Sequence, residues 1–292
     1  MPNQLQDFLT FAASIVTEAL PFVILGIIIS VAVQVWLPDN WLRWLPKRRG
    51  LRQITVSLIG VFVPVCECGN VPLARGLAAK GLSASESLVF LLAAPILNPV
   101  TIITTQQAFA NDPAVLVGRI AGGFLIANVV GWVFMNRRDE DLLQPQFARA
   151  CRATGRVRQN QIIRSLELFG HEARHMLPAL LIGAGVAALV QVAVPREVLV
   201  ALGSDSAWSI IAMLTLAFIV SICSNVDAFF ALAFKDAFMA GSLVSFLTFG
   251  PMIDIKLLSM MRTTYRSRVL AQVSLLVLLL SAAIGLGVNY VF

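Results

Sequence analysis

The sequence predicts an all-α polytopic membrane protein of two inverted-topology repeats, each with about three full spans plus a broken or re-entrant helical hairpin. Three observations predict this fold class. The 292 residues are 58% hydrophobic and 13% charged, with a mean hydropathy of +0.82, whereas about a quarter of a soluble domain is charged. Six uncharged runs are long enough to cross a bilayer, which takes about 20 residues. Finally, the two halves of the chain resemble each other.

The internal repeat has an offset of 156 to 157 residues. Cys223 follows Cys66 by 157 residues, and both lie just behind a long apolar run. The same offset relates Pro21 to Pro178, Gly26 to Gly183, Gln34 to Gln191 and Pro38 to Pro195. We therefore expect 1–136 to be the first membrane repeat, 137–170 a basic cytoplasmic linker and 171–292 the second membrane repeat.

The expected full spans are the long uncharged runs. They are Ala19 to Pro38, Ser87 to Asn111, Ile120 to Asn136, Met176 to Pro195, Ser206 to Val226 and Val269 to Phe292. A shorter run, Ala237 to Ile253, is expected to extend to Met261. No Lys or Arg precedes the first run, so we interpret it as a retained span rather than a signal peptide.

A helical hairpin or one discontinuous helix is expected where two short apolar pieces, Gln53 to Val65 and Val71 to Ala79, flank a break. The ten residues from Val63 to Pro72 hold two cysteines, a glutamate, a glycine and two prolines. Such a sequence interrupts a helix, and at membrane depth a broken backbone must line a cavity or be covered by protein. The second break, Ser221 to Asp227, is its repeat.

The basic residues set the expected orientation, because cytoplasmic loops carry an excess of Lys and Arg. Sixteen of the 22 lie in three clusters that we place in the cytoplasm: Arg43 to Arg52, Arg137 to Arg174, and Arg262 to Arg268. The loop Pro195 to Ala207 is then external. The first hairpin, Gln53 to Lys80, enters from the cytoplasm and the second, Ser206 to Asp236, from outside, with both chain ends external.

The net charge of +6 is explained by these loops and does not indicate nucleic-acid binding. The linker is expected to be a solvated connector near anionic headgroups, with a regulatory or partner-binding role as the alternative. We expect a multi-pass protein of the inner (plasma) membrane whose partners are the lipid bilayer and a small-molecule or metalloid substrate, with a homo-oligomer left open. No cofactor is expected.

The thiols are the first candidate site residues. Thiolates select soft metals and metalloids, and the repeat predicts that Cys223 faces Cys66 and Cys68 across a pseudo-two-fold axis, so that the three could hold a metal near the midplane. The alternative is that each cysteine simply packs as a small apolar residue. Cys151, in the linker, is expected to be incidental, and the four cysteines show no disulfide-framework spacing.

Ionisable and amide side chains flank both breaks. Glu67 and Asp227 are candidates for substrate binding and for ion coupling, since ionisable groups at membrane depth are costly. Alternatively, they cap the following half-helices, as Asn70 and Asn225 would. Half-helices starting at Val71 and Val226 would point unpaired N–H groups into the cavity. Gly69 and Ser224 complete the candidate set at the breaks.

A third repeated feature is Pro95-x-x-Asn98, matched by Pro251-x-x-Asp254 with an offset of 156 residues. We expect these four residues to kink their helices and turn an amide and a carboxylate toward the cavity. Asp254 is the third coupling candidate, or else it pairs permanently with Lys256 or caps a half-helix. Lys256, Lys235 and Asp236 are expected nearer the interfaces as snorkelling or paired charges.

The chain resembles a known family in its Cys-x-Cys-Gly-x-x-Pro break, the Ala-Pro-x-x-Asn-Pro kink about 25 residues later, the weaker second copy and the basic central loop. These features are similar to those of the predicted-permease family whose characterised members are organoarsenical efflux permeases. The resemblance covers roughly Glu18 to Phe292. It implies a polytopic inner-membrane permease with a thiol-dependent substrate site at Cys66 and Cys68.

The leading hypothesis is a secondary transporter, not an enzyme, for a thiophilic substrate such as a trivalent organoarsenical or a heavy-metal species. No nucleotide-binding signature occurs, so an ion gradient or a separate subunit would supply the energy. A small sulfur-containing or other anion is the rival substrate. A membrane thiol oxidoreductase and a non-transporting scaffold or assembly factor are the rivals from other classes.

Overall fold

The computed structural model describes residues 2–38, 40–63, 65–110, 112–153, 161–193, 206–235 and 237–291. Within these ranges the chain is almost entirely helical, and the described residues form no β-strand, only one isolated bridge between Leu143 and Tyr265. The prediction of an all-α protein is confirmed. Of the expected outer loop Pro195 to Ala207, the residues up to 205 lie outside the described part of the chain, and so does Asp236.

Five helical segments are long and apolar enough to cross a membrane, by length and composition, so the chain is a multi-pass membrane protein. They are α1 (Pro2–Trp36), α4 (Ala84–Leu97) together with α5 (Pro99–Ala108), α6 (Pro113–Phe134), α9 (Gln161–Ala193) and α15 (Ser267–Val291). Two other expected spans fall on shorter apolar helices, α11 (Ser206–Val220) and α13 (Ala240–Phe249).

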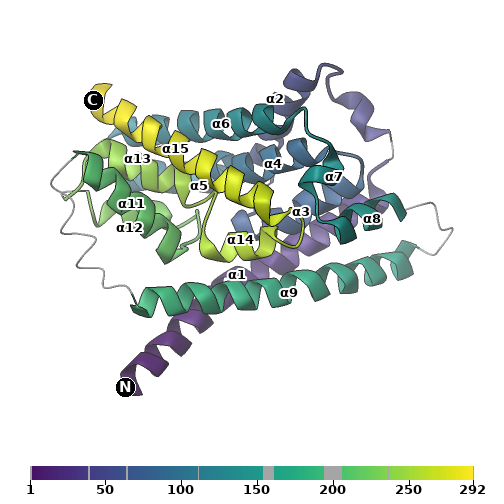
Figure 1. Cartoon of the computed structure of the whole chain (residues 1–292), viewed down its shortest axis with the longest axis horizontal. Coiled ribbons are helices and arrows are strands. Elements are labelled where there is room, and N and C mark those ends of the chain that lie inside the picture. Colours follow the sequence, from purple (N-terminus) through teal and green to yellow (C-terminus); the bar gives the residue numbers. More distant parts are fainter. Residues whose placement is uncertain are drawn as a thin grey trace.

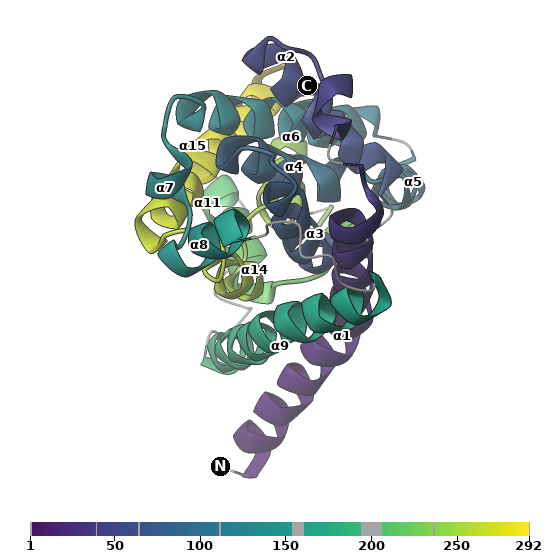
Figure 2. The same cartoon turned by 90° about the vertical axis from the view of Figure 1, so that its right-hand side faces the viewer.

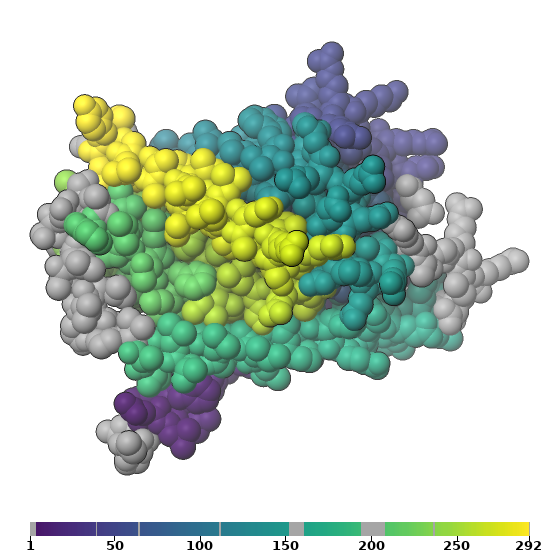
Figure 3. All heavy atoms as spheres, in the orientation of Figure 1, coloured from purple at the N-terminus to yellow at the C-terminus, as the bar shows by residue number. Residues whose placement is uncertain are grey.

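The longest helices, α1 and α9, pack side by side along one side of the molecule (Figure 1). The N-terminal part of α1 projects past the rest of the bundle, as Figures 2 and 3 show from two directions. Next to this pair lie two shorter helices, α3 (Glu67–Ala79), which packs on α1, and α14 (Ile255–Met261), which packs on α9. The remaining apolar helices α4, α6, α11, α13 and α15 form the other layer.

The order of the helices repeats along the chain. The first half continues with η1 (Trp41–Trp44), α2 (Arg49–Ile59) and η2 (Gly60–Phe62), and the second half contains α12 (Asp227–Leu232). The first residues of α2 and α11 are 206 − 49 = 157 positions apart, and those of α5 and α14 are 255 − 99 = 156 apart. Between the halves lie α7 (Asp139–Leu142) and α8 (Pro145–Ala153). The sequence offset is therefore also an offset of helix boundaries.

Glycines let the long helices approach the short ones closely. A Cβ atom on Gly26 of α1 would lie 2.2 Å from the carbonyl oxygen of Gly69 in α3. Its repeat counterpart, Gly183 of α9, approaches the backbone of Lys256 in α14, where an added Cβ would lie 3.0 Å away. Small residues permit such contacts between membrane helices, whose association depends on van der Waals packing. The two glycines thus set how near α1 and α9 lie to the two interrupted regions.

The break in the run from Ser87 falls at Asn98, not at Pro95, which lies inside α4. A residue that precedes proline is disfavoured in the helical region, and Asn98, before Pro99, has the extended ψ of 129°. Its side chain then caps α5 by accepting a hydrogen bond from the backbone N–H of Val100, at 3.0 Å. The Asn98-Pro99 pair therefore determines where this helix is interrupted.

Helix α3 begins at Glu67, four residues before the expected Val71. Cys66 is its N-cap residue, and Cys68, Gly69 and Asn70 lie in its first turn. The second half differs: α12 begins at Asp227 and has only six residues. The two half-helices that follow the breaks are therefore unequal in length.

Candidate functional site

The two interrupted regions meet in the interior of the protein. The thiol sulfur of Cys66, the thiol sulfur of Cys223 and a carboxylate oxygen of Glu67 lie within 4.8 Å of one another. All three residues are buried, with exposed fractions of 1% for Cys66 and Glu67 and 4% for Cys223. We call these three residues the thiol–carboxylate cluster. Cys68 is also buried, but it is not a member of this group.

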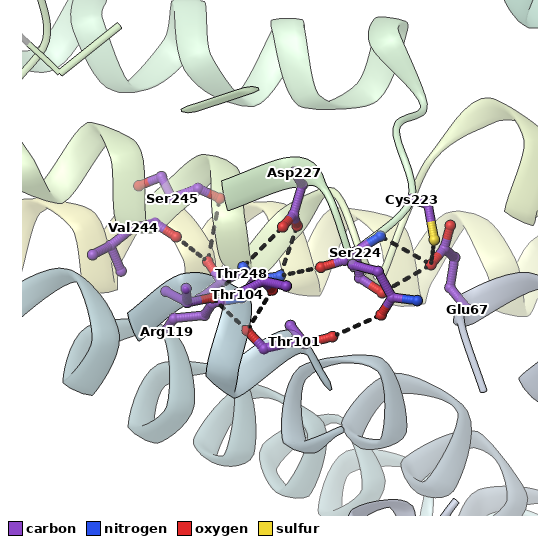
Figure 4. A network of polar contacts seen from close by, with 12 residues as sticks. Glu67, Thr101, Thr104, Arg119, Cys223, Ser224, Asp227, Val244, Ser245 and Thr248 are labelled. Atoms are coloured by element: carbon purple, nitrogen blue, oxygen red, sulfur yellow. Dashed lines mark hydrogen bonds and ion pairs between the residues drawn. The ribbon is translucent and has the colours of Figure 1, made fainter. Parts of the chain in front are cut away.

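Glu67 bridges the two halves of the chain. Its carboxylate accepts hydrogen bonds from the backbone N–H of Ser224 at 3.2 Å and from the Ser224 hydroxyl at 3.0 Å. The Cys223 thiol donates to the same oxygen at a sulfur–oxygen distance of 3.7 Å. Figure 4 shows these contacts converging on Glu67. Glu67 therefore holds the second break in place, rather than capping α3 by a side-chain hydrogen bond.

Lys256 pairs with Glu67 across the cluster. Its ammonium nitrogen lies 3.2 Å from a Glu67 carboxylate oxygen and donates to the backbone carbonyl of Ser221 at 3.2 Å. Lys256 is 2% exposed, so of the two expected alternatives, a snorkelling or a paired charge, the structure shows a paired charge. The physical reason is the Glu67 carboxylate: a buried charge is tolerated where an opposite charge and a hydrogen-bond acceptor receive it.

Asp254 borders the cluster. One of its oxygens caps α14 by accepting from the backbone N–H of Leu257. The other lies 3.8 Å from the Lys256 ammonium and has no hydrogen-bond partner in the described part of the chain. Asp254 therefore both caps α14 and lies near Lys256, as the two alternatives predicted. Its second carboxylate oxygen remains available as an acceptor.

Asp227 forms a second buried ion pair, with Arg119 of α6. The two guanidinium nitrogens of Arg119 donate to the two carboxylate oxygens at 2.9 and 2.6 Å. Arg119 also donates to the Thr105 hydroxyl at 2.8 Å and approaches the backbone carbonyl of Ser224 at 3.4 Å. As Figure 4 shows, this polar network runs from the ion pair to Ser224 and on to Glu67. A bidentate pair of this kind fixes both side chains in orientation.

Sequence reasoning did not select Arg119, although it is 1% exposed and contacts a predicted site residue. The expected uncharged run begins at Ile120 and therefore excludes Arg119. The signal that would have found it is Asp112-Pro113, since proline is favoured in the first turn of a helix. A helix from Pro113 makes Arg119 its seventh residue, inside a candidate membrane span.

The asparagines of the first half tie the break together. Asn98 donates to the carbonyl of Val65 at 3.2 Å, and Asn70 approaches the same oxygen at 3.4 Å. Asn225 instead accepts from the Thr101 hydroxyl at 3.3 Å, which links the second break to α5. These residues hold backbone and helix ends. The predicted Pro95 and Pro251 are likewise buried, in α4 and in the turn before α14.

One further carboxylate reaches the cluster from α1. Glu18 is partly buried and lies within electrostatic range of Lys256 and Glu67. It is three residues before Pro21, and the sequence alone gave no reason to select it. Glu18 thus adds a negative charge beside the thiol–carboxylate cluster.

The cluster has the donors of a soft-metal site. Thiols suit soft metals and metalloids, and the adjacent carboxylate can complete the coordination or accept a proton from a thiol. Two carboxylates, Glu67 and Asp254, surround a single ammonium group, Lys256. This balance favours an electrophilic species over a free anion at the cluster.

Comparisons with known proteins agree on one family. The model of the predicted permease family ArsP_1 matches residues 4–290. The chain is 35% identical over 265 residues to the UPF0718 protein YcgR of Bacillus subtilis, covering 87% of each chain. It is 31% identical over 276 residues to a Streptococcus mutans protein whose name describes a subunit of a two-component membrane permease complex, covering 93% of this chain and 91% of that one. No solved structure matches the chain.

Proposed function

Because the chain belongs to the predicted permease family, we propose that it is a secondary transporter whose substrate binds at the thiol–carboxylate cluster. The substrate class is a small thiophilic species, such as a trivalent organoarsenical or a heavy-metal species. The observation that carries this proposal is the convergence of Cys66, Glu67 and Cys223 within 4.8 Å. Cys68, the second residue of α3, would be a fourth contact once the cluster rearranges.

The rest of the predicted substrate site has supporting roles in this proposal. Ser224, Asn225 and Asp227 would position the second break, and Asn70, Asn98 and Gly69 the first. Pro95 would shape α4, and Pro251 and Asp254 would shape the start of α14. A site shared by two breaks suits alternating access, in which one portion of the protein moves around a fixed position near the midplane.

An inverted-topology arrangement is part of the same proposal. The repeated helix boundaries support it, as does a reciprocal pair of contacts: α12 of the second half packs on α5 of the first, and α3 of the first half packs on α14 of the second. The segments α2–α3 and α11–α12 would then be the two hairpins that enter from opposite sides. The repeats would be residues 1–136 and 171–292, joined by the linker 137–170.

The test is a transport assay in cells and everted vesicles, with trivalent methylarsenite as the probe. Cys66→Ser and Cys223→Ser are each expected to lower the transport rate by about tenfold or more, because a hydroxyl is a poor ligand for a soft centre. Cys151→Ser is the matched control and should transport as the parent does, since Cys151 lies in α8, away from the cluster. Membrane protein levels are measured by immunoblot in each case.

A variant with all four cysteines replaced separates the rival substrates. If it keeps the parent's transport rate, the soft-ligand mechanism is wrong and a small anion becomes the leading substrate class. The thiol oxidoreductase alternative predicts instead a Cys66–Cys68 disulfide that turns over with a thiol substrate. The structure describes all four cysteines, and none of them is in a disulfide. Alkylation and mass measurement under oxidising conditions test that alternative.

The oligomeric state is open to the same kind of experiment. One relative is named as a subunit of a two-component membrane permease complex. We propose that this chain also works with a partner, either a second copy or a separate subunit. Affinity purification in mild detergent, followed by mass measurement of the intact complex, distinguishes the two.

A further inference from the structure

A cavity of about 710 Å³ lies away from the thiol–carboxylate cluster. It is enclosed by α3, α8, α9 and the chain that follows α14, on the side of the molecule that carries the basic linker. Arg75 of α3 lines it, eight residues after Glu67, which corresponds to about 12 Å along the helix. The other lining residues with polar side chains are Gln144, Gln146, His171, His175, Arg262 and Thr263.

Arg75 supplies a fixed guanidinium at the wall of this cavity. It is 2% exposed, pairs with Glu172 at 2.8 Å and donates to the Thr263 carbonyl at 3.1 Å. Its guanidinium also stacks on the ring of Phe147, at 4.2 Å from the centroid. These bonds use Nε and Nη1, and Nη2 makes no hydrogen bond within the described part of the chain. One guanidinium nitrogen is therefore left for a ligand in the cavity.

The only two histidines of the chain line the same cavity. His171 and His175 are one turn apart on α9, with ring centroids 4.8 Å apart in an edge-to-face arrangement. Each imidazole can donate a hydrogen bond. Arg262, an exposed residue after α14, adds a second guanidinium at the mouth.

The lining is positive and rich in donors. The described residues that line the cavity include no Asp or Glu, and Glu172 nearby is engaged with Arg75. The guanidinium of Arg262 beside the histidine pair repels a metal cation, which would otherwise suit histidines one turn apart. Guanidinium and imidazole donors together match the oxygens of a tetrahedral oxyanion.

We propose that this cavity is a binding site for a phosphate group, carried either by a free phosphate compound or by the headgroup of an anionic phospholipid. Arg75, His171, His175 and Arg262 are its ligands. The volume far exceeds that of the phosphate group alone, which leaves room for the remainder of a larger molecule. The site is distinct from the thiol–carboxylate cluster and does not depend on the function proposed there.

The test uses the full chain purified in a neutral detergent. In the first arm, inorganic phosphate is titrated by calorimetry. In the second, the protein is placed in nanodiscs of phosphatidylcholine with a fraction of phosphatidylglycerol, and the lipid retained is measured by native mass spectrometry. The variants are Arg262→Ala and the double variant His171→Ala with His175→Ala. Arg268→Ala removes the same charge from an exposed position that does not line the cavity, and it is the matched control.

Loss of one or two charge-assisted hydrogen bonds is expected to weaken binding by about tenfold or more in one arm, with Arg268→Ala unchanged. Weakening in the first arm identifies a free phosphate compound as the source, and weakening in the second alone identifies a lipid headgroup. If neither probe binds the parent, or if Arg268→Ala weakens binding as much as Arg262→Ala, the proposal is overturned.

Discussion

Glu67 and Lys256 form a buried ion pair at the thiol–carboxylate cluster, and either charge without the other would destabilise the fold. Removing one partner of a buried pair leaves an uncompensated charge, at a cost of about 3–5 kcal/mol. Glu67 also holds Ser224 and Cys223, so the pair supports the geometry of both thiols. The contribution of this ion pair to the stability of the fold can therefore be measured by substituting either residue with an uncharged one of similar size.

We expect Lys256→Met to lower the apparent melting temperature in detergent by roughly 6–20 °C, given about 2–4 °C for each kcal/mol in a large domain. The double variant Lys256→Met with Glu67→Gln should regain part of that loss, because it removes the unpaired charge. Lys47→Met, at an exposed lysine, is the control. Equal melting temperatures for Lys256→Met and Lys47→Met would show that the ion pair does not stabilise the fold.

Asp254 is the coupling candidate that the geometry makes easiest to test. Asparagine can cap α14 as aspartate does, so Asp254→Asn should fold and bind substrate. It cannot exchange a proton, and the repeat already has Asn98 at the equivalent place. We expect the variant to lose the dependence of transport on the pH gradient. Flux measured in vesicles with and without an imposed gradient decides this, and a variant that still follows the gradient as the parent does removes Asp254 from the coupling mechanism.

At the scale of the element, the close contact of α1 with α3 depends on missing side chains on both helices, and Gly26 is the one on α1. A Cβ atom on Gly26 would meet backbone atoms of Gly69 at 2.2 to 2.8 Å, and backbone cannot move aside as a flexible side chain can. The contact also fixes how α1 lies against the first turn of α3, where Cys68 is placed.

Gly26→Ala should therefore destabilise the protein by about 1–3 kcal/mol through overpacking and reduce transport, because the first turn of α3 must shift. Gly185→Ala in α9 has nothing within 4 Å of the added atom and should change neither property. Thermal unfolding and transport of the two variants are compared side by side. Indistinguishable results for the two would mean that α1 can slide on α3 at no cost.

The sequence predicted the elements better than their boundaries. Uncharged length and proline spacing were enough to find α4, α6, α9 and α15, since a membrane imposes a minimum length on a span. The predicted start of α3 is four residues too late, because two cysteines, a glutamate, a glycine and two prolines predict a break there, whereas the helix begins at Glu67 and contains Pro72. The internal repeat predicted that Cys223 faces Cys66. No local sequence pattern predicted that Lys256 and Glu18 lie near these thiols, or that Arg119 pairs with Asp227.

At the scale of the whole molecule, three buried ion pairs among the described residues connect the first half of the chain to the second. They are Glu67 with Lys256, Arg75 with Glu172, and Arg119 with Asp227. Partners far apart in sequence could not be paired by a pattern search, because a pair is recognisable only after the fold brings it together. Any motion of one half against the other must keep or exchange these pairs.

The topology prediction concerns the whole molecule too. A cysteine introduced into the Arg43 to Arg52 loop should react with a membrane-impermeant maleimide only from the cytoplasm, and one in the Pro195 to Ala207 loop only from outside. The native thiols give a low background. Burial raises the pKa of the Cys151 thiol to about 11, so little thiolate is present near neutral pH, and the other three are buried. Labelling of both loops from one side would contradict the inverted repeat.

The lengths of α1 and α9 have a mechanical consequence. With 35 and 33 residues, each is about 50 Å long, whereas the hydrocarbon layer is about 30 Å thick. A straight rod of that length fits inside the layer only at an inclination of about 50°, beyond the usual range for such helices, so their ends must run into the headgroups. At Gly26 and Gly183 these two helices come into close contact with the backbone of Gly69 and of Lys256, near the Glu67–Lys256 ion pair. Bilayer thickness, by setting the inclination of the two rods, therefore acts on the walls of the site.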